Sequence, residues 1–194
     1  MPKHSLSDYK NKRNFKSTSE PSGKKRARKS GHPIFVIQKH DARNLHYDLR
    51  LEMDGVLKSW AVPKGPSTDP SEKRLAIETE DHPMDYASFE GVIPKGEYGA
   101  GEVIVWDKGT YRNKKGRKTV EKSYDDGEIT VELKGKKLKG GYALVKTGER
   151  SGKNQWLFIK MDDEHADARR NPTSTEPKSV LSGKTVRDLK KEKR

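Results

Sequence analysis

The 194-residue sequence contains no cysteine, which excludes disulfides and thiolate metal ligands. Any metal ion must therefore be held by His, Asp, Glu or water. No apolar run approaches the roughly 18 residues that span a membrane, and the N-terminus lacks the apolar stretch of a secretory signal. We expect a cytoplasmic protein with no membrane partner. Only 29% of the residues are apolar and 37% are charged, so part of the chain is predicted to lie outside a packed core.

Positive charge is concentrated at the two ends of the chain. Residues 1–32 hold ten Lys and Arg against two Asp and Glu, and residues 165–194 hold nine against four, which accounts for the whole net charge of +13. Basic arms on a neutral body indicate a polyanionic partner, most often nucleic acid, although tails that only aid solubility are the alternative. We therefore divide the chain into a partly flexible basic N-terminal arm (1–32), a globular domain (33–162) and a basic C-terminal tail (163–194).

Short runs of β-branched, aromatic and aliphatic residues between turn residues predict strands throughout the globular domain. The expected strands are residues 34–39, 45–53, 56–62, 74–80, 102–107, 128–133, 141–146 and 155–161. Residues 91–101 carry four glycines and are expected to be too broken for a strand. The predicted fold class is all-β, a closed or nearly closed eight-stranded β-barrel with flexible basic tails, and one short helix is expected near residues 185–193.

Alternation along residues 45–53 places ionisable side chains on one face of the expected strand, including His46, Asp48 and Arg50. His40 lies six residues before His46, beyond an expected turn at 41–44, so a hairpin would bring it back toward His46 and Asp48. Two imidazoles and one carboxylate form a ligand set suited to Mn²⁺, Fe²⁺, Zn²⁺ or Co²⁺. The alternative is that these histidines are ordinary polar residues on a barrel wall.

The third histidine of the globular domain is His82. An uninterrupted strand would place it on one face with Arg74, Glu78 and Glu80. Cationic Arg50, Lys64 and Arg74 suit a site that binds a phosphate beside a metal, where His82 can transfer a proton. A strand-ending turn is the alternative role for residues 82–83.

Four motifs resemble the 3′-phosphoesterase domain of bacterial DNA ligase D, the enzyme of bacterial non-homologous end joining, and its stand-alone archaeal and bacterial relatives. They are FVIQKHDARNLHYDLRLE (35–52), SWAVPKGP (59–66), EDHPMDY (80–86) and FEGVIPKGEYGAG (89–101). The similarity covers roughly residues 6–162, with several long motifs in the right order.

The resemblance implies an eight-stranded barrel whose groove holds one Mn²⁺ beside the scissile phosphate. His40, His46 and Asp48 match the metal ligands, whereas the groups that contact the phosphate and carry the catalysis match Arg50, His82 and Tyr86. Supporting polar residues of the groove match Gln38, Lys64, Arg74 and Glu80. Family members remove a 3′-terminal ribonucleoside and then the 3′-phosphate, giving a 3′-OH that can be ligated.

The arm at residues 9–21 resembles the family segment that assists the ribonuclease step. Arg13 and Glu20 agree with it, but Asn14 stands where the family usually has Asp, a change that bears on the ribonuclease step more than on the phosphatase step. The implied substrate is a DNA primer–template ending in a 3′-phosphate or a 3′-ribonucleotide. The resemblance also implies the ligase, polymerase and Ku of an end-joining system as partners, for a nucleoid-associated monomer.

Two other functions fit parts of the sequence. A small-barrel Fe²⁺ oxygenase uses the same set of two histidines and one carboxylate, but needs a pocket for an organic substrate. A non-catalytic accessory protein that binds DNA ends through its basic arms would show salt-sensitive affinity, as would the enzyme. Metal dependence of product formation separates all three.

Overall fold

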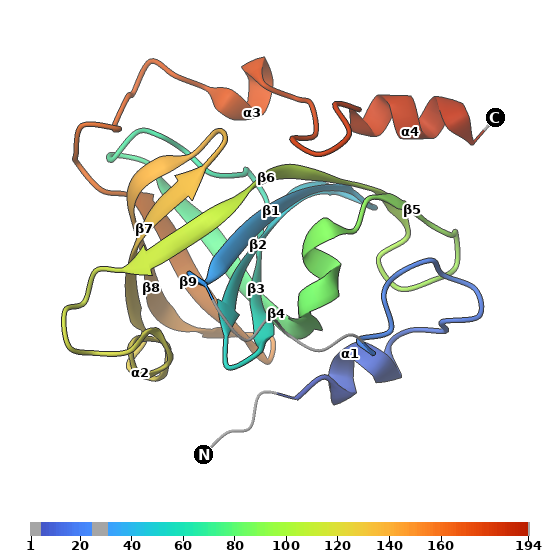
Figure 1. Cartoon of the computed structure of the whole chain (residues 1–194), viewed down its shortest axis with the longest axis horizontal. Coiled ribbons are helices and arrows are strands. Elements are labelled where there is room, and N and C mark those ends of the chain that lie inside the picture. The colour runs from blue at the N-terminus through green and yellow to red at the C-terminus, as the bar shows by residue number, and fades with distance from the viewer. Residues whose placement is uncertain (1–4, 25–30, 194) are drawn as a thin grey trace.

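Eight antiparallel strands form a closed ring in the computed structural model, which describes residues 5–24 and 31–193 (Figure 1). Their order is β1-β2-β3-β4-β9-β8-β7-β6, and pairing of β1 with β6 closes the ring without making a regular barrel. The strands are β1 (Ile34–Asp41), β2 (Leu45–Met53), β3 (Val56–Val62), β4 (Lys73–Pro83), β6 (Gly101–Asn113), β7 (Glu128–Gly135), β8 (Lys139–Arg150) and β9 (Lys153–Lys160). The all-β, eight-stranded prediction is confirmed.

A ninth strand lies where the sequence predicted none. β5 (Gly91–Ile93) pairs with the start of β6 from outside the ring, so the expectation that residues 91–101 are too broken for a strand was wrong at their N-terminal end. Ile93 is buried, which gives this short segment enough apolar contact to pair despite the glycines. Strands β6 and β8 also run past their expected ends, to Asn113 and Arg150.

The inside of the ring is filled by apolar side chains from alternate strand positions. Leu49 and Leu51 of β2 point inward, together with Trp60, Trp106 and Trp156 of three other strands, and all are almost fully buried. Because the odd positions of β2 face this inner core, its even positions face outward. The ionisable face expected on this strand therefore belongs to the outer surface of the ring.

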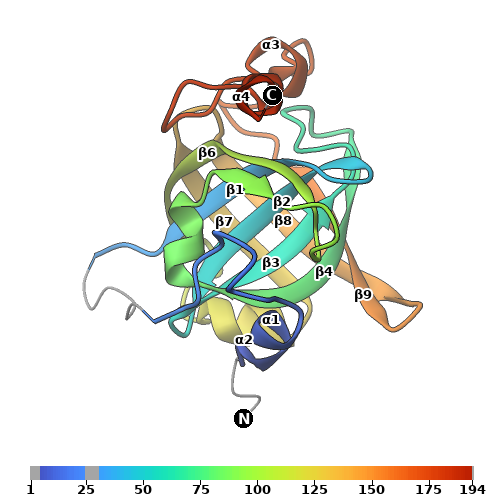
Figure 2. The same cartoon turned by 90° about the vertical axis from the view of Figure 1, so that its right-hand side faces the viewer.

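A second apolar cluster covers that outer surface. Val36, Leu57 and Val105 of the ring pack in it with Tyr9 of α1 (Ser7–Asn11) and Tyr86 of η1 (Met84–Ser88). Figure 2 shows the N-terminal segment and η1 lying over this face. Residues 5–24 of the expected arm are therefore part of the packed structure, since Tyr9 is completely buried. Residues 25–30, the most basic part of the arm, lie outside the described residues.

The C-terminal segment crosses one end of the ring, and α2 (Val120–Asp125) lies at the other (Figure 1). The indole N–H of Trp106 donates to the Glu176 carbonyl at 2.8 Å, and the amide of Val180 donates to the Val105 carbonyl at 2.9 Å. These contacts replace the expected flexible tail with an ordered one containing α3 (Pro172–Thr175) and α4 (Val186–Glu192). The short helix predicted near 185–193 is confirmed as α4. No helix in the described ranges is long and apolar enough to cross a membrane.

Candidate metal and phosphate site

His40, His46 and Asp48 converge on the outer face of the β1–β2 hairpin. Antiparallel pairing places His40 directly opposite His46, with Asp48 two residues further along β2 on the same face. The Asp48 carboxylate lies 3.4 Å from His40 Nδ1 and 3.3 Å from His46 Nε2, and the three ligand atoms lie within 4.8 Å of one another. The predicted hairpin therefore brings the three candidate ligands together.

Both imidazoles are oriented by backbone carbonyls. His40 Nε2 lies 2.6 Å from the Gly99 carbonyl, and His46 Nδ1 lies 2.9 Å from the Asn44 carbonyl. A carbonyl only accepts, so each of these nitrogens carries a proton, and His40 Nδ1 and His46 Nε2 are the nitrogens that face Asp48 and can bind a metal ion once they carry no proton. Metal-bound histidines are commonly oriented in this way by a hydrogen bond from the other ring nitrogen.

Each imidazole lies at a distance from Asp48 that is typical of two ligands of one divalent metal ion. Ligands at about 2.0–2.2 Å from an ion in a tetrahedral-like arrangement stand roughly 3.4 Å apart, and His40 Nδ1 and His46 Nε2 lie at this distance from Oδ2 and Oδ1 of Asp48, respectively. Burial acts to raise the pKa of Asp48, but Arg50 and the two imidazoles outweigh it and hold the pKa well below its usual range. The carboxylate is therefore ionised at neutral pH and available as a ligand.

Arg50 lies beside the metal ligands and is fixed by two neutral partners. Its Nε donates to Gln38 Oε1 at 2.7 Å and its Nη1 donates to Ser59 Oγ at 2.8 Å, while Nη2 is 3.5 Å from Asp48 Oδ2. The guanidinium also lies over the Tyr86 ring, 4.9 Å from its centroid. Nη2 and the second N–H of Nη1 thus have hydrogen-bonding capacity left for an oxyanion.

His82 is buried on the other side of Arg50. Its Nδ1 lies 2.9 Å from the Glu80 carbonyl, so this nitrogen carries a proton, and its Nε2 lies 3.3 Å from Arg13 Nη2. Burial, together with the nearby Arg50 and Arg13 cations, holds the pKa of His82 well below its usual range. The imidazole is therefore neutral at neutral pH, with an acceptor at Nε2.

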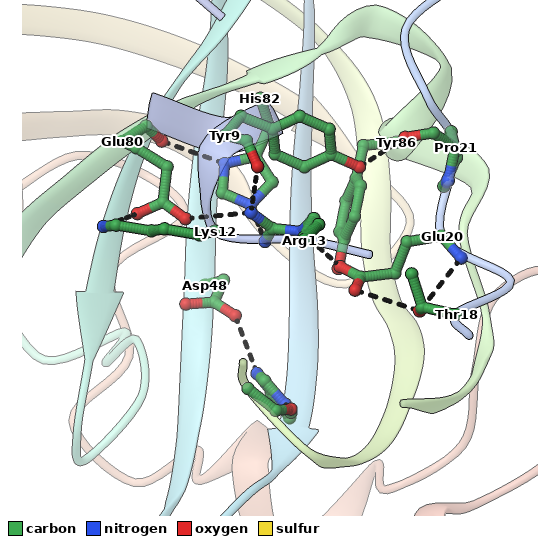
Figure 3. A network of polar contacts seen from close by, with 12 residues as sticks. Tyr9, Lys12, Arg13, Thr18, Glu20, Pro21, Asp48, Glu80, His82 and Tyr86 are labelled. Carbon is green, nitrogen blue, oxygen red and sulfur yellow. Dashed lines mark hydrogen bonds and ion pairs between the residues drawn. The ribbon is translucent and has the colours of Figure 1, made fainter. Parts of the chain in front are cut away.

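The N-terminal segment completes the site through Arg13 (Figure 3). Its Nε donates to Glu20 Oε2 at 2.9 Å and its Nη1 to Glu80 Oε1 at 3.2 Å. The hydroxyl of Tyr86 donates to Glu20 at 2.7 Å, and burial followed by the charge of Glu20 raises the Tyr86 pKa well above its usual range. Tyr86 thus remains protonated. Arg13 and Glu20 of the arm, both predicted from the sequence, are bonded to Glu80 and Tyr86 of the globular domain.

One pocket of about 290 Å³ collects most of the predicted residues. The predicted residues that line it are Arg13, His40, His46, Asp48, Arg50, Glu80, His82 and Tyr86. Gln38 and Glu20 lie behind this lining and hold Arg50, Arg13 and Tyr86 in place.

Lys64 and Arg74 are not brought to this pocket. They line a second pocket with Glu72, which forms an ion pair with Arg74. Glu78, expected on the face of His82, instead accepts from the indole of Trp156 at 2.9 Å on the inner side of the ring. The cause is a register shift in the β3–β4 pairing, which interrupts the alternation between Glu78 and His82.

Three further residues of the site were not identified from the sequence. Ser59 bonds Arg50, and Tyr98 and Lys153 line the pocket. Ser59 lies directly opposite Arg50 in the β2–β3 pairing, and Asp54-Gly55, a dipeptide typical of two-residue hairpin turns, sets this register, so the sequence could have identified Ser59. No local sequence signal places Tyr98 or Lys153, because they come from a loop and from the start of β9.

Together, the fold and the site define a small β-protein with a candidate divalent-metal site next to the side chains of Arg50 and Arg13. A sequence model described as the DNA ligase D 3′-phosphoesterase domain matches residues 38–146, and the chain belongs to this family. That range contains the three candidate metal ligands as well as Arg50, His82 and Tyr86. Family membership supports a hydrolase role.

Several curated relatives are similar over most of the chain. The multifunctional non-homologous end joining protein LigD of Pseudomonas aeruginosa is 49% identical over 185 residues, covering 93% of this chain and 22% of that protein. The protein of the same name from Mycolicibacterium smegmatis is 49% identical over 162 residues, covering 82% of this chain and 21% of that protein. The LigD protein of Mycobacterium tuberculosis strain H37Rv is 50% identical over 163 residues, covering 82% of this chain and 20% of that protein. The chain thus spans about a fifth of the length of these relatives.

Proposed function

We propose that this protein is a divalent-metal-dependent phosphoesterase that heals DNA 3′ ends for ligation. It removes a 3′-terminal ribonucleoside where one is present, which leaves a 3′-phosphate on the primer, and it then hydrolyses the 3′-phosphate with water, which releases inorganic phosphate and leaves a 3′-OH. The observation that carries the proposal is the convergence of His40, His46 and Asp48 next to Arg50 in one pocket. Membership of the 3′-phosphoesterase family supports the same reaction class.

Each group of the pocket has a role that follows from its contacts. His40, His46 and Asp48 would hold the metal ion, Mn²⁺ in this proposal, which supplies Lewis-acid polarisation of a phosphoryl oxygen when bound. Arg50 binds a second phosphoryl oxygen through the N–H groups that its bonds to Gln38 and Ser59 leave free, which are those of Nη2 and the second one of Nη1. A rigidly held guanidinium stabilises developing negative charge without having to reorganise.

His82 has the position of a proton donor to the leaving 3′ oxygen or of a transition-state hydrogen-bond partner. In the free protein Nε2 has no proton to give, because burial and the Arg50 and Arg13 charges keep the ring neutral. The negative charge of a bound phosphate favours protonation of the ring. We infer that His82 gains its proton with the substrate, and that Tyr86 contacts the phosphate from beside Arg50.

The N-terminal segment supports the ribonuclease activity through Arg13 and Glu20. Asn14, where the family usually has Asp, is exposed, and its side-chain oxygen accepts from the Lys16 amide at 3.1 Å. An aspartate makes this local turn contact equally well, so the change leaves the fold of the arm intact. We therefore propose that the protein has both the phosphatase and the ribonuclease activity. The ribonuclease step is the one more affected by Asn14, which lacks the carboxylate of the usual Asp.

The test uses a DNA primer–template with a 3′-phosphate and a second one with a single 3′-terminal ribonucleotide. Each is incubated with the protein and Mn²⁺ or with a chelator, and the products are resolved by denaturing electrophoresis. We expect Mn²⁺-dependent conversion to a 3′-OH, and loss of most turnover in His40→Ala. His165→Ala is the matched control, because His165 is an exposed histidine of the C-terminal segment. A His40→Ala protein with normal Mn²⁺-dependent phosphatase activity would contradict the assignment.

The alternatives give different results in the same assay. An accessory protein binds the ends but forms no product with any metal. The oxygenase alternative is disfavoured by the pocket lining, where Arg13, Arg50 and Lys153 suit a phosphate better than an apolar organic molecule. As partners we propose the ligase, polymerase and Ku of an end-joining system, because the relatives named above are end-joining proteins. We also propose that the protein acts as a monomer at DNA ends in the cytoplasmic nucleoid.

A further inference from the structure

Tyr98 presents an exposed aromatic ring at the pocket. Its side chain is 45% exposed, whereas every other Phe, Tyr and Trp of the described residues is more buried. It lines the same pocket as the candidate metal ligands. No residue of the mechanism above needs this ring, so its exposure is left without an explanation.

The backbone ties Tyr98 to the candidate metal ligands. The carbonyl of the next residue, Gly99, accepts the hydrogen bond from His40 Nε2 at 2.6 Å. Gly99 has φ of +75°, and a Cβ there would lie 3.3 Å from His40 Cε1, so glycine is needed for this close approach. Turn hydrogen bonds from Glu97 to Pro94 and from Ala100 to Glu97 hold the loop. The backbone of Tyr98 is therefore held next to the candidate metal ligand His40.

Cations of the N-terminal segment hold the ring from one direction. Lys12 Nζ lies 5.0 Å from the ring centroid and Arg13 Cζ lies 5.5 Å from it. Both cations also bond Glu80 at 3.2 Å, so they are fixed in turn. Cation–π contact of this kind orients an aromatic ring while the rest of its surface stays open to solvent.

We propose that Tyr98 is a positioning residue that stacks against the base of the 3′-terminal nucleotide. The proposal rests on the proposed function: with the terminal phosphate held by Arg50, the attached nucleoside must leave the pocket past its rim. Every base offers a flat π-face, so stacking there positions the end without selecting a sequence. The base concerned is the one 5′ to the scissile phosphate, which is the terminal base of an end with a 3′-phosphate and the penultimate base of an end with a terminal ribonucleotide.

The test compares two primer–templates that carry the same 3′-phosphate, one with a normal 3′-terminal nucleotide and one with an abasic terminal sugar. Stacking on an aromatic side chain is worth a factor of about 5 to 150 per base. We expect Tyr98→Ala to lower kcat/KM on the normal end by a factor in this range, mainly through KM. The variant should differ little from wild type on the abasic end. Tyr98→Phe keeps the ring and should retain most of the wild-type value on both.

Leu181→Ala is the control for loss of an exposed apolar side chain, since Leu181 is 51% exposed and does not line the pocket. An equal loss on the normal and abasic ends in Tyr98→Ala would overturn the proposal, because the ring would then act only by holding Lys12 and Arg13. A metal-free binding assay with 2-aminopurine at the 3′ terminus separates this question from catalysis. Quenching by wild type and Tyr98→Phe but not by Tyr98→Ala supports stacking even if no product forms, and equal fluorescence with all three proteins refutes it.

Discussion

Replacement of Gln38 by methionine should destabilise the fold and disable Arg50 together. Gln38 is completely buried on β1, and its amide group makes three hydrogen bonds. Its Oε1 accepts from Arg50 Nε at 2.7 Å, and its Nε2 donates to the carbonyls of Tyr86 and Phe89 at 2.9 and 3.0 Å. One side chain thus joins Arg50, for which we propose a phosphate-binding role, to the η1 segment that carries Tyr86.

The magnitude follows from the groups that Gln38→Met leaves without partners. Methionine fills a similar volume but neither donates nor accepts strongly, so the Phe89 carbonyl and the Arg50 Nε–H lose the partner that Gln38 supplied, whereas the Tyr86 carbonyl keeps its hydrogen bond from the Phe89 amide at 3.0 Å. Each unsatisfied group costs about 1–3 kcal/mol, which gives roughly 2–6 kcal/mol in total. Because domains are stable by only about 5–15 kcal/mol, this loss is a large share of the unfolding free energy.

Urea denaturation measures this loss, and the phosphatase assay at low temperature measures the effect on Arg50. Gln38→Glu is the informative comparison, because its carboxylate still accepts from Arg50 but does not donate to both carbonyls. We expect Gln38→Glu to keep more activity than Gln38→Met. A Gln38→Met protein that loses less than about 1 kcal/mol of unfolding free energy would show that these hydrogen bonds do not hold the site together.

Three further predictions concern single residues. Mn²⁺ at 100 times its Kd should stabilise the wild type by about 2.7 kcal/mol and raise its melting temperature, whereas Asp48→Asn should show no rise; an equal rise in both would exclude Asp48 as a ligand. The pKa of Asp163 is lowered to about 2, because hydrogen bonds from Lys160 and two backbone amides outweigh its burial. Its contribution is therefore present above the ordinary carboxyl pKa and disappears as pH falls through about 2, so Asp163→Asn should destabilise the protein to urea at neutral pH and not near pH 2. Thr185→Ala removes the capping box of α4 and should lower the local stability of this helix by about 1 kcal/mol, which speeds hydrogen exchange of its amides. Unchanged exchange rates would show that the capping box does not stabilise α4.

The metal-ligand set was predictable because it depends only on local rules. A hairpin turn at 41–44 and alternation along β2 are enough to bring His40, His46 and Asp48 to one face, and the structure has this register. The eight strands were predictable for a similar reason, since each one carries its own apolar alternation. What these rules leave open is which face of the ring each side chain occupies.

The location of the site on the outer surface depends on contacts between distant parts of the chain. The polar side chains at the even positions of β2 could line either the inside of the strand ring or a groove on its outer surface. Only the size of the side chains that fill the inside decides between these two locations. Trp60, Trp106 and Trp156 fill the ring and leave no room there for Arg50 and His82. The outer face in turn needs Tyr9 from the N-terminal segment to bury it, a contact that no local pattern of that basic segment predicts.

The irregular pairing between β3 and β4 determines which of the expected side chains reach the site. Ser59 lies opposite Thr79 and Leu57 lies opposite His82, so two steps along β3 correspond to three along β4. The sequence gives no sign of this extra residue, because residues 78–82 are polar on both faces of the strand. With regular pairing, His82 would point inward with Glu78, away from Ser59 and Arg13. The bulge instead directs His82 outward to those two residues while Glu78 keeps its inner partner Trp156, so one inserted residue serves both the core and the site.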